Sequence, residues 1–370
     1  MVAGVRRPHP IPSCLGFDAD SCAQYSGKEN LDLEPSIDVL VQELIHLIRS
    51  RYISTDDKVI QMDLAKKVQF FTLDVISSVG LGKTFGMLKA DTDIDDYAKS
   101  AEEGLMIAAK AFALGINGLT QTPIIGPLIG PSPKDKSGFG KMIATCFRYV
   151  DERVASPTDK RSDMLASFIR HGLQGDELRS EALEQIIAGS DTTAAAIRGT
   201  LLLLLTNSRV YRKLQREIDE AVRGGKVPAS SDEAIISGRQ ARQLPYLQAV
   251  IREGLRVLPP VTNIFSRDVP PDGDEVTVNG QKYFLPGGTC VGESVVSMHH
   301  SKETYGEDAA AFRPERWFEP DEEKLAAMTR VNDLMFGAGK WMCLGKPVAQ
   351  LELPKIIFEV SVPSLGRSLA

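Results

Sequence analysis

The sequence predicts a mainly α-helical protein with small antiparallel β-sheets. Through most of the first 260 residues, apolar side chains recur every three or four positions, which is typical of amphipathic helices. Beyond residue 260 this period gives way to short apolar runs that flank turn residues. A chain of 370 residues, 43% of them hydrophobic, can bury a sizeable core as one large domain or two modest ones.

The first half of the chain predicts an irregular N-terminus followed by helices. Residues 1–35 are expected to be irregular because prolines interrupt them, the last being Pro35. Apolar stripes then predict helices over residues 36–53, 62–80, 97–113 and 141–154. Between the last two, residues 115–133 are rich in Gly and Pro yet apolar, which predicts a packed or lid-like loop.

The longest predicted helix covers residues 180–207. Asn207 or Ser208 would cap a charged helix that follows it, and Pro245 would open a helix that ends at Leu258. Asn279-Gly280 lies between two alternating apolar runs, which is the signature of a β-hairpin. Residues 291–296 predict one more short strand.

Composition excludes several classes of protein. The formal net charge is −6, so the chain lacks the basic excess of a nucleic-acid-binding protein. Five widely spaced cysteines do not form a disulfide scaffold and favour a reducing compartment. No stretch approaches the roughly 18 apolar residues of a membrane-spanning helix.

Two motifs place charged groups inside apolar helices. The run 188–193 (Ala-Gly-Ser-Asp-Thr-Thr) puts Asp191 in the longest helix, where a buried carboxylate requires a partner or a purpose. A kink in which a threonine bonds back to a carbonyl is the alternative. Glu253 and Arg256 share one face of a largely apolar helix. They would form either a surface ion pair or a buried pair, with Arg316 of Pro314-Glu315-Arg316 as a further partner.

The third motif is a glycine-rich run with one cysteine, residues 336–345. Its glycines allow a tight turn and close approach to a flat ligand. A helix is expected to start near Cys343, and loop amides there could stabilise a metal-bound thiolate. The alternative is a buried structural cysteine beside a turn.

Taken in order and spacing, these motifs resemble the cytochrome P-450 superfamily of haem-thiolate monooxygenases, specifically its fungal secondary-metabolism members. The similarity runs from about residue 25 to about residue 353. It implies an unmatched segment 1–24, an incomplete cytochrome P-450 domain 25–353 and an atypical tail 354–370. We expect a chain shortened at both ends, in which Pro354 interrupts the helix after the cysteine loop.

The resemblance assigns roles to individual residues. Cys343 would be the axial ligand of the iron of haem b, and Asp191 with Thr192 would relay protons to bound oxygen. Glu253, Arg256 and Arg316 would form a buried triad that holds the cysteine loop. The residues that would contact the haem are Cys343, Arg267, Phe336, Gly339, Trp341 and Gly345. Trp341 replaces the usual Arg or His, so Arg267 would contribute more to haem retention.

The resemblance also implies the reaction and its partners. One oxygen atom from O₂ would be inserted into a small lipophilic substrate of a natural-product or mycotoxin pathway. Electrons would come from NADPH through NADPH–cytochrome P-450 reductase. An inactive shortened remnant and a haem-thiolate isomerase or dehydratase remain alternatives, and the Asp191–Thr192 pair favours oxygen activation over the second. Family members usually lie anchored on the cytoplasmic side of the endoplasmic reticulum, so peripheral membrane contact is expected here.

Overall fold

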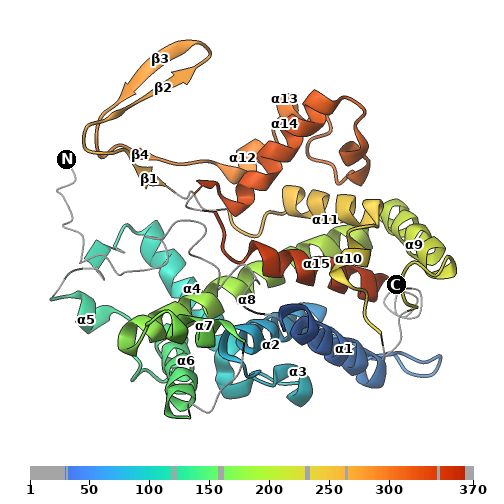
Figure 1. The fold of residues 1–370 in the computed structure, drawn as a ribbon, viewed down its shortest axis with the longest axis horizontal. Coiled ribbons are helices and arrows are strands. Elements are labelled where there is room, and N and C mark those ends of the chain that lie inside the picture. The colour runs from blue at the N-terminus through green and yellow to red at the C-terminus, as the bar shows by residue number, and fades with distance from the viewer. Residues whose placement is uncertain are drawn as a thin grey trace.

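Helices packed around the long helix α8 (Gly175–Thr206) form most of the molecule (Figure 1). The computed structural model describes residues 30, 32–116, 118–119, 122, 124–156, 162–229, 234–262, 266–339 and 342–362. Two small antiparallel sheets of two strands each complete the described part. The predicted fold class, mainly helical with small antiparallel sheets, is therefore confirmed.

In sequence order, seven of the described helices precede α8 and seven follow it. Those before it are α1 (Leu33–Arg51), α2 (Leu64–Leu81), α3 (Met87–Ala90), α4 (Tyr97–Ala113), α5 (Gly126–Ile129), α6 (Gly138–Ala155) and α7 (Met164–Arg170). Those after it are α9 (Ser208–Arg223), α10 (Gly238–Ala241), α11 (Pro245–Val257), α12 (Val295–His299), α13 (Lys302–Tyr305), α14 (Glu322–Asp333) and α15 (Lys346–Ser361). Single 3₁₀ turns are η3 (Ile94–Asp96), η5 (Pro314–Phe318) and η6 (Leu334–Phe336).

Close helix contacts place the functional motifs. Helix α2 lies along α8, α1 packs on α2 and α15, and α11 packs on α8, α9 and α15. At Gly189 of α8 an added Cβ would lie 2.6 Å from Ile76 Cδ1, and at Gly254 of α11 it would lie 2.4 Å from Thr200 Oγ1. Glycine is needed at both points because a methyl group would not fit. The two contacts bring α2 and α11 against the two halves of α8.

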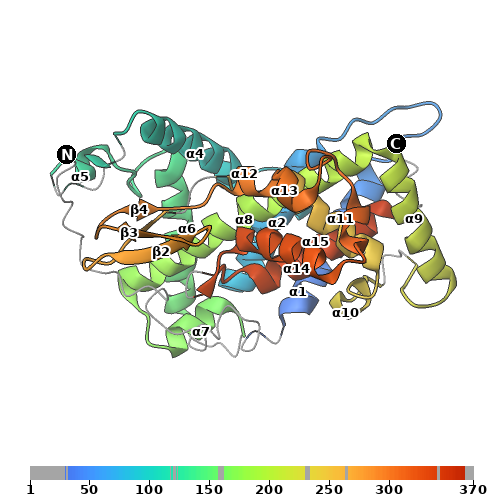
Figure 2. The same cartoon turned by 90° about the horizontal axis from the view of Figure 1, so that it is seen from above.

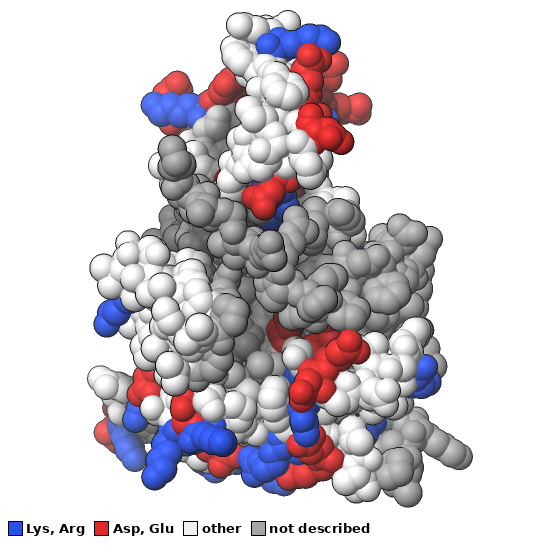
Figure 3. All heavy atoms as spheres, turned by 90° about the vertical axis from the view of Figure 1, so that its left-hand side faces the viewer, with Lys and Arg blue, Asp and Glu red and all other residues white. Residues whose placement is uncertain are grey.

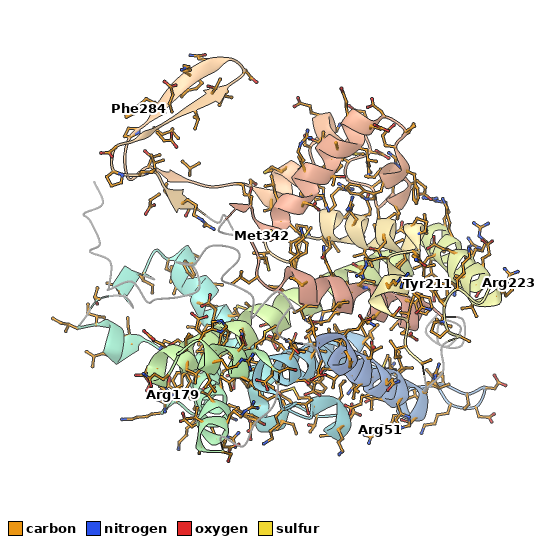
Figure 4. All side chains as sticks on the ribbon, viewed as in Figure 1. Arg51, Arg179, Tyr211, Arg223, Phe284 and Met342 are labelled. Carbon is orange, nitrogen blue, oxygen red and sulfur yellow. The ribbon has the colours of Figure 1, made fainter. Side chains whose placement is uncertain are left out.

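The sheets extend away from the helices as a narrow arm in Figure 1, and in the view from above they are drawn over the half of the molecule that carries α6 (Figure 2). Strand β1 (Arg267–Asp268) pairs with β4 (Cys290–Val291), and β2 (Asp274–Val278) pairs with β3 (Gln281–Leu285). Asn279 (φ 51°) and Gly280 (φ 78°) both adopt the left-handed conformation that a two-residue hairpin turn requires. The predicted hairpin is therefore confirmed, and Phe284 marks it in Figure 4.

Three predicted boundaries were wrong. The strand expected at residues 291–296 ends at Val291, and Val295–His299 is helix α12, because Val295 and His299 are both buried and so need i, i+4 spacing. Helix α1 begins at Leu33, with Pro35 in its first turn, where a backbone N–H has no helical partner to lose. Pro354 does not interrupt α15, since burial of residues 352–361 against neighbouring helices outweighs the lost hydrogen bond.

Of the two alternatives expected for residues 115–133, the packed loop is wrong for the described part, and the lid-like loop stays a prediction. Ile124 and Leu128 expose 79% and 80% of their surface, and a short helix, α5, forms within it. On the face seen in Figure 3, described residues without charge gather at the left, between the hairpin and the charged lower edge. Among the described helices, none has the length and hydropathy to cross a bilayer.

Candidate functional site

Cys343 lies in the loop between η6 and α15, and its side chain is exposed. The loop is closed by two hydrogen bonds, from the Cys343 N–H to the Phe336 carbonyl (2.6 Å) and from the Lys346 N–H to the Cys343 carbonyl (3.3 Å). Gly337 and Gly339 have φ values of 72° and 59°, which other residues adopt only with strain. Exposure excludes the alternative of a buried structural cysteine for Cys343. Met342, labelled in Figure 4, marks this loop.

The electrostatics around the Cys343 sulfur combine opposing effects. Neighbouring protein atoms raise the pKa of the Cys343 thiol by desolvation, whereas hydrogen bonds from the backbone N–H groups of Gly345 and Lys346 act to lower this pKa. The net result is a raised pKa, and binding of a metal ion to the sulfur would require loss of the thiol proton. The two N–H groups at the start of α15 would then stabilise the thiolate.

Glu253, Arg256 and Arg316 form one buried network. Arg256 donates to both Glu253 carboxylate oxygens (2.9 and 2.8 Å), and Arg316 Nε donates to Glu253 Oε1 (2.8 Å). The carboxylate also accepts hydrogen bonds from the indole N–H of Trp317 and the backbone N–H of Arg313, each 3.0 Å long. The side chains of all three residues of the triad are at most 1% exposed. The surface ion pair considered for Glu253 and Arg256 is therefore wrong.

The two arginines connect α11 to the segment before η5. Arg256 donates to the carbonyls of His299, Ala309 and Ala311, and Arg316 donates to those of Tyr305, Asp308 and Ala311. Helix α14 packs on α12 and α13 in this segment and leads into η6, directly before the cysteine loop. The network thus contacts the segment on which α14 packs, and α14 leads into the cysteine loop.

Asp191 and Thr192 lie next to each other on α8 but bond in different directions. Thr192 Oγ1 donates to the Ala188 carbonyl (2.7 Å), so the back-bond named as an alternative is present. Asp191 Oδ1 accepts a 2.8 Å hydrogen bond from Gln69 Nε2 on α2. Burial raises the pKa of Asp191, although Gln69 and Arg198 act to lower it.

The sequence did not indicate the partner of Asp191. Gln69 is buried on α2, and Arg198 Nη2 donates to its Oε1 (2.8 Å). The three residues line a cavity of about 1000 Å³ between α2, α4 and α8. The signal in the sequence was a polar residue, Gln69, inside an otherwise apolar helical stretch. This signal does not show that its partner is Asp191, 122 residues away.

The sequence profile of the cytochrome P-450 family matches residues 23–360. The chain belongs to the cytochrome P-450 family. Three similar proteins are cytochrome P-450 monooxygenases: ABA1 of Pyricularia oryzae, aba1 of Botryotinia fuckeliana and abl1 of Leptosphaeria maculans. They are 42%, 40% and 33% identical to this chain over 91%, 92% and 92% of its length. The chain spans 65%, 66% and 58% of these relatives.

The cysteine loop of this cytochrome P-450 fits a haem group. It offers one exposed sulfur, the ligand that a thiolate-bound haem needs, with backbone N–H donors beside it. At Gly339 an added Cβ would meet no atom of the described residues within 4 Å, and at Gly345 it would lie 3.8 Å from the Cys343 sulfur, so the described part of the loop leaves space beside the sulfur. Cys343, Gly339 and Gly345 are the residues that would hold the group here.

Of the other residues predicted to contact the haem, the structure describes Phe336 and Arg267. Phe336 is half-buried, with Lys346 Nζ 5.2 Å from its ring centroid. Arg267 is exposed on β1, where its Nη1 donates to the Ser266 carbonyl (2.9 Å). Trp341 lies outside the described residues. His299 on α12 is buried, and its Nε2 lies 3.3 Å from the Val331 carbonyl.

Proposed function

We propose that this chain provides the haem-thiolate centre of a monooxygenase, with Cys343 as the axial iron ligand. The observation that carries the proposal is the exposed Cys343 sulfur in a glycine-rich loop, beside the N–H groups of Gly345 and Lys346. When bound, the haem would supply oxygen activation, which thiolate ligation favours. The residues proposed to surround it are Arg267, Phe336, Gly339, Trp341 and Gly345.

Asp191 and Thr192 are proposed to hold and move protons on the opposite side of the site. The raised pKa of Asp191 supports this role, because a carboxyl that protonates nearer to neutral pH exchanges protons readily. We further propose a small lipophilic substrate of a fungal natural-product pathway, and electrons from NADPH through NADPH–cytochrome P-450 reductase. The exposed apolar side chains of Ile124 and Leu128 support a peripheral contact with a cytoplasmic membrane surface.

A carbon monoxide difference spectrum of the purified, haem-loaded chain tests the central proposal. Wild type is expected to give the red-shifted Soret band of a thiolate-ligated ferrous haem, and Cys343→Ser is expected to abolish it. Cys290→Ser is the matched control because Cys290 is also exposed but lies on strand β4. A spectrum typical of histidine ligation, or the same band in Cys343→Ser, would refute the proposal, and a chain that binds no haem would support the inactive remnant.

A further inference from the structure

An amide group separates Asp191 from the nearest cation that interacts with it. Gln69 Nε2 donates to Asp191 Oδ1 (2.8 Å), while Gln69 Oε1 accepts from Arg198 Nη2 (2.8 Å). Arg198 is itself held by a 2.9 Å hydrogen bond from its Nε to the Ala65 carbonyl, one turn earlier on α2. Since a guanidinium can only donate, Oε1 of Gln69 must face Arg198 and Nε2 must face Asp191.

This arrangement differs from a direct ion pair in its effect on the carboxyl. An arginine in contact with an aspartate lowers the pKa of that aspartate by roughly 1–3 units. Here Arg198 acts on Asp191 only across the amide, and burial outweighs both partners, so the pKa of Asp191 is raised. The carboxyl is therefore held in a fixed position without being locked in its ionised form.

Both acidic and basic side chains line the cavity beside Asp191. The cavity that it lines also receives Asp63 and Lys66 from the start of α2, Asp93 and Asp96 from the turn before α4, Lys99 and Glu102 from α4, and Arg198 from α8. Tyr97 of α4 is a further titratable group that interacts with Asp191. Of these charged groups, Arg198 is the one that acts to lower the pKa of Asp191, and it does so across the Gln69 amide.

We propose that Gln69 is a positioning residue that fixes the Asp191 carboxyl toward the cavity. Arg198 orients the amide, and the amide orients the carboxyl. The value of this arrangement for catalysis rests on the proton-relay role proposed above. The positioning of the Asp191 carboxyl by Gln69 is independent of that role, since it involves only residues of α2 and α8.

The test follows protonation of Asp191 directly. Infrared spectra of the full chain with ¹³C-labelled aspartate are recorded across pH, and the spectra of Asp191→Asn are subtracted to isolate the Asp191 carboxyl. Gln69→Leu removes the donor and fills its space, so the titration midpoint is expected to move to higher pH. Gln185→Leu is the matched control, because Gln185 is also a buried glutamine, on α8, whose side-chain amide makes no hydrogen bond among the described residues.

A second variant keeps the proposal testable if Gln69→Leu fails to fold. Gln69→Glu preserves the size of the side chain and an acceptor for Arg198, but it places a carboxylate against Asp191, so the midpoint is again expected to rise. An unchanged midpoint in the Gln69 variants, or a shift equal to that of Gln185→Leu, would overturn the proposal. A midpoint that falls in Gln69→Leu would also overturn it, since loss of a hydrogen bond that acts to lower the pKa of Asp191 must raise that pKa. These readouts need no turnover, so a failed carbon monoxide spectrum leaves them valid.

Discussion

Arg316 Nε lies 2.8 Å from Glu253 Oε1, although the two residues are 63 positions apart in the chain and both side chains are buried. Arg256 binds the same carboxylate, so one anion faces two guanidinium groups. A buried charge that loses its partner costs roughly 3–5 kcal/mol. We therefore expect Glu253→Gln to lower the free energy of unfolding by about that amount, measured by chemical denaturation, and to reduce haem incorporation.

The control for this prediction is Glu322→Gln, an exposed position in the first turn of α14. Its free energy of unfolding is expected to change by less than about 0.5 kcal/mol. A Glu253→Gln protein with wild-type stability and haem content would show that the network does not support the cysteine loop.

Replacing Thr192 tests the proposed proton relay. In Thr192→Ala the hydroxyl that bonds to the Ala188 carbonyl is lost, so NADPH use is expected to continue while product falls and hydrogen peroxide is released. Thr206→Ala is the matched control, because Thr206 makes the same 2.7 Å back-bond to Leu202 at the other end of α8. Coupling of NADPH use to product formation, measured with a reductase, should stay unchanged in the control. Equal coupling in both variants would count against the relay.

Glu315 provides a prediction about pH and stability. Burial acts to raise the pKa of Glu315, but hydrogen bonds from Arg209, Lys213 and Tyr246 outweigh it and lower this pKa to about 2. A carboxyl with a lowered pKa stabilises the fold above its unfolded pKa of about 4.3, and this stability is lost as the pH falls toward 2.

We expect Glu315→Gln to lower the free energy of unfolding by about 1–2 kcal/mol at pH 7, a figure discounted for partial exposure. The difference from wild type should shrink as the pH falls from about 4.5 to about 2. Denaturation curves at a series of pH values measure this, with the exposed Glu184→Gln on α8 as control. A difference that does not depend on pH would show that the effect is not ionic.

Gly254 of α11 packs against Thr200 of α8 and lies between Glu253 and Arg256 of the buried network. In Gly254→Ala the new methyl group would stand 2.4 Å from Thr200 Oγ1, so the helices must separate. Overpacking of this kind costs roughly 1–3 kcal/mol, more than the gain of about 1 kcal/mol from the helix propensity of alanine. Thermal denaturation should show a lower midpoint than wild type. Gly118→Ala is the control, because an added Cβ there meets no atom of the described residues within 4 Å, and its midpoint should match that of wild type.

The sequence by itself determined the elements whose signals are local. The helix at residues 97–113, the Pro245 start of α11 and the Asn279-Gly280 turn all agree with the structure. Periodicity, proline at the first helical position and left-handed turn residues act within a few positions, so one chain segment contains the whole signal. The same holds for the motif around Cys343, whose order with the other motifs indicated the family.

Only the tertiary structure decided which polar groups meet and which are buried. It brought Gln69 to Asp191, buried Glu253 among two arginines and a tryptophan, and turned the Val295–His299 segment into a helix. It also kept α15 intact through Pro354. The physical reason is that burial and hydrogen-bond partners depend on residues far away in the chain, and the packing free energy they supply exceeds local propensities of about 1 kcal/mol per residue.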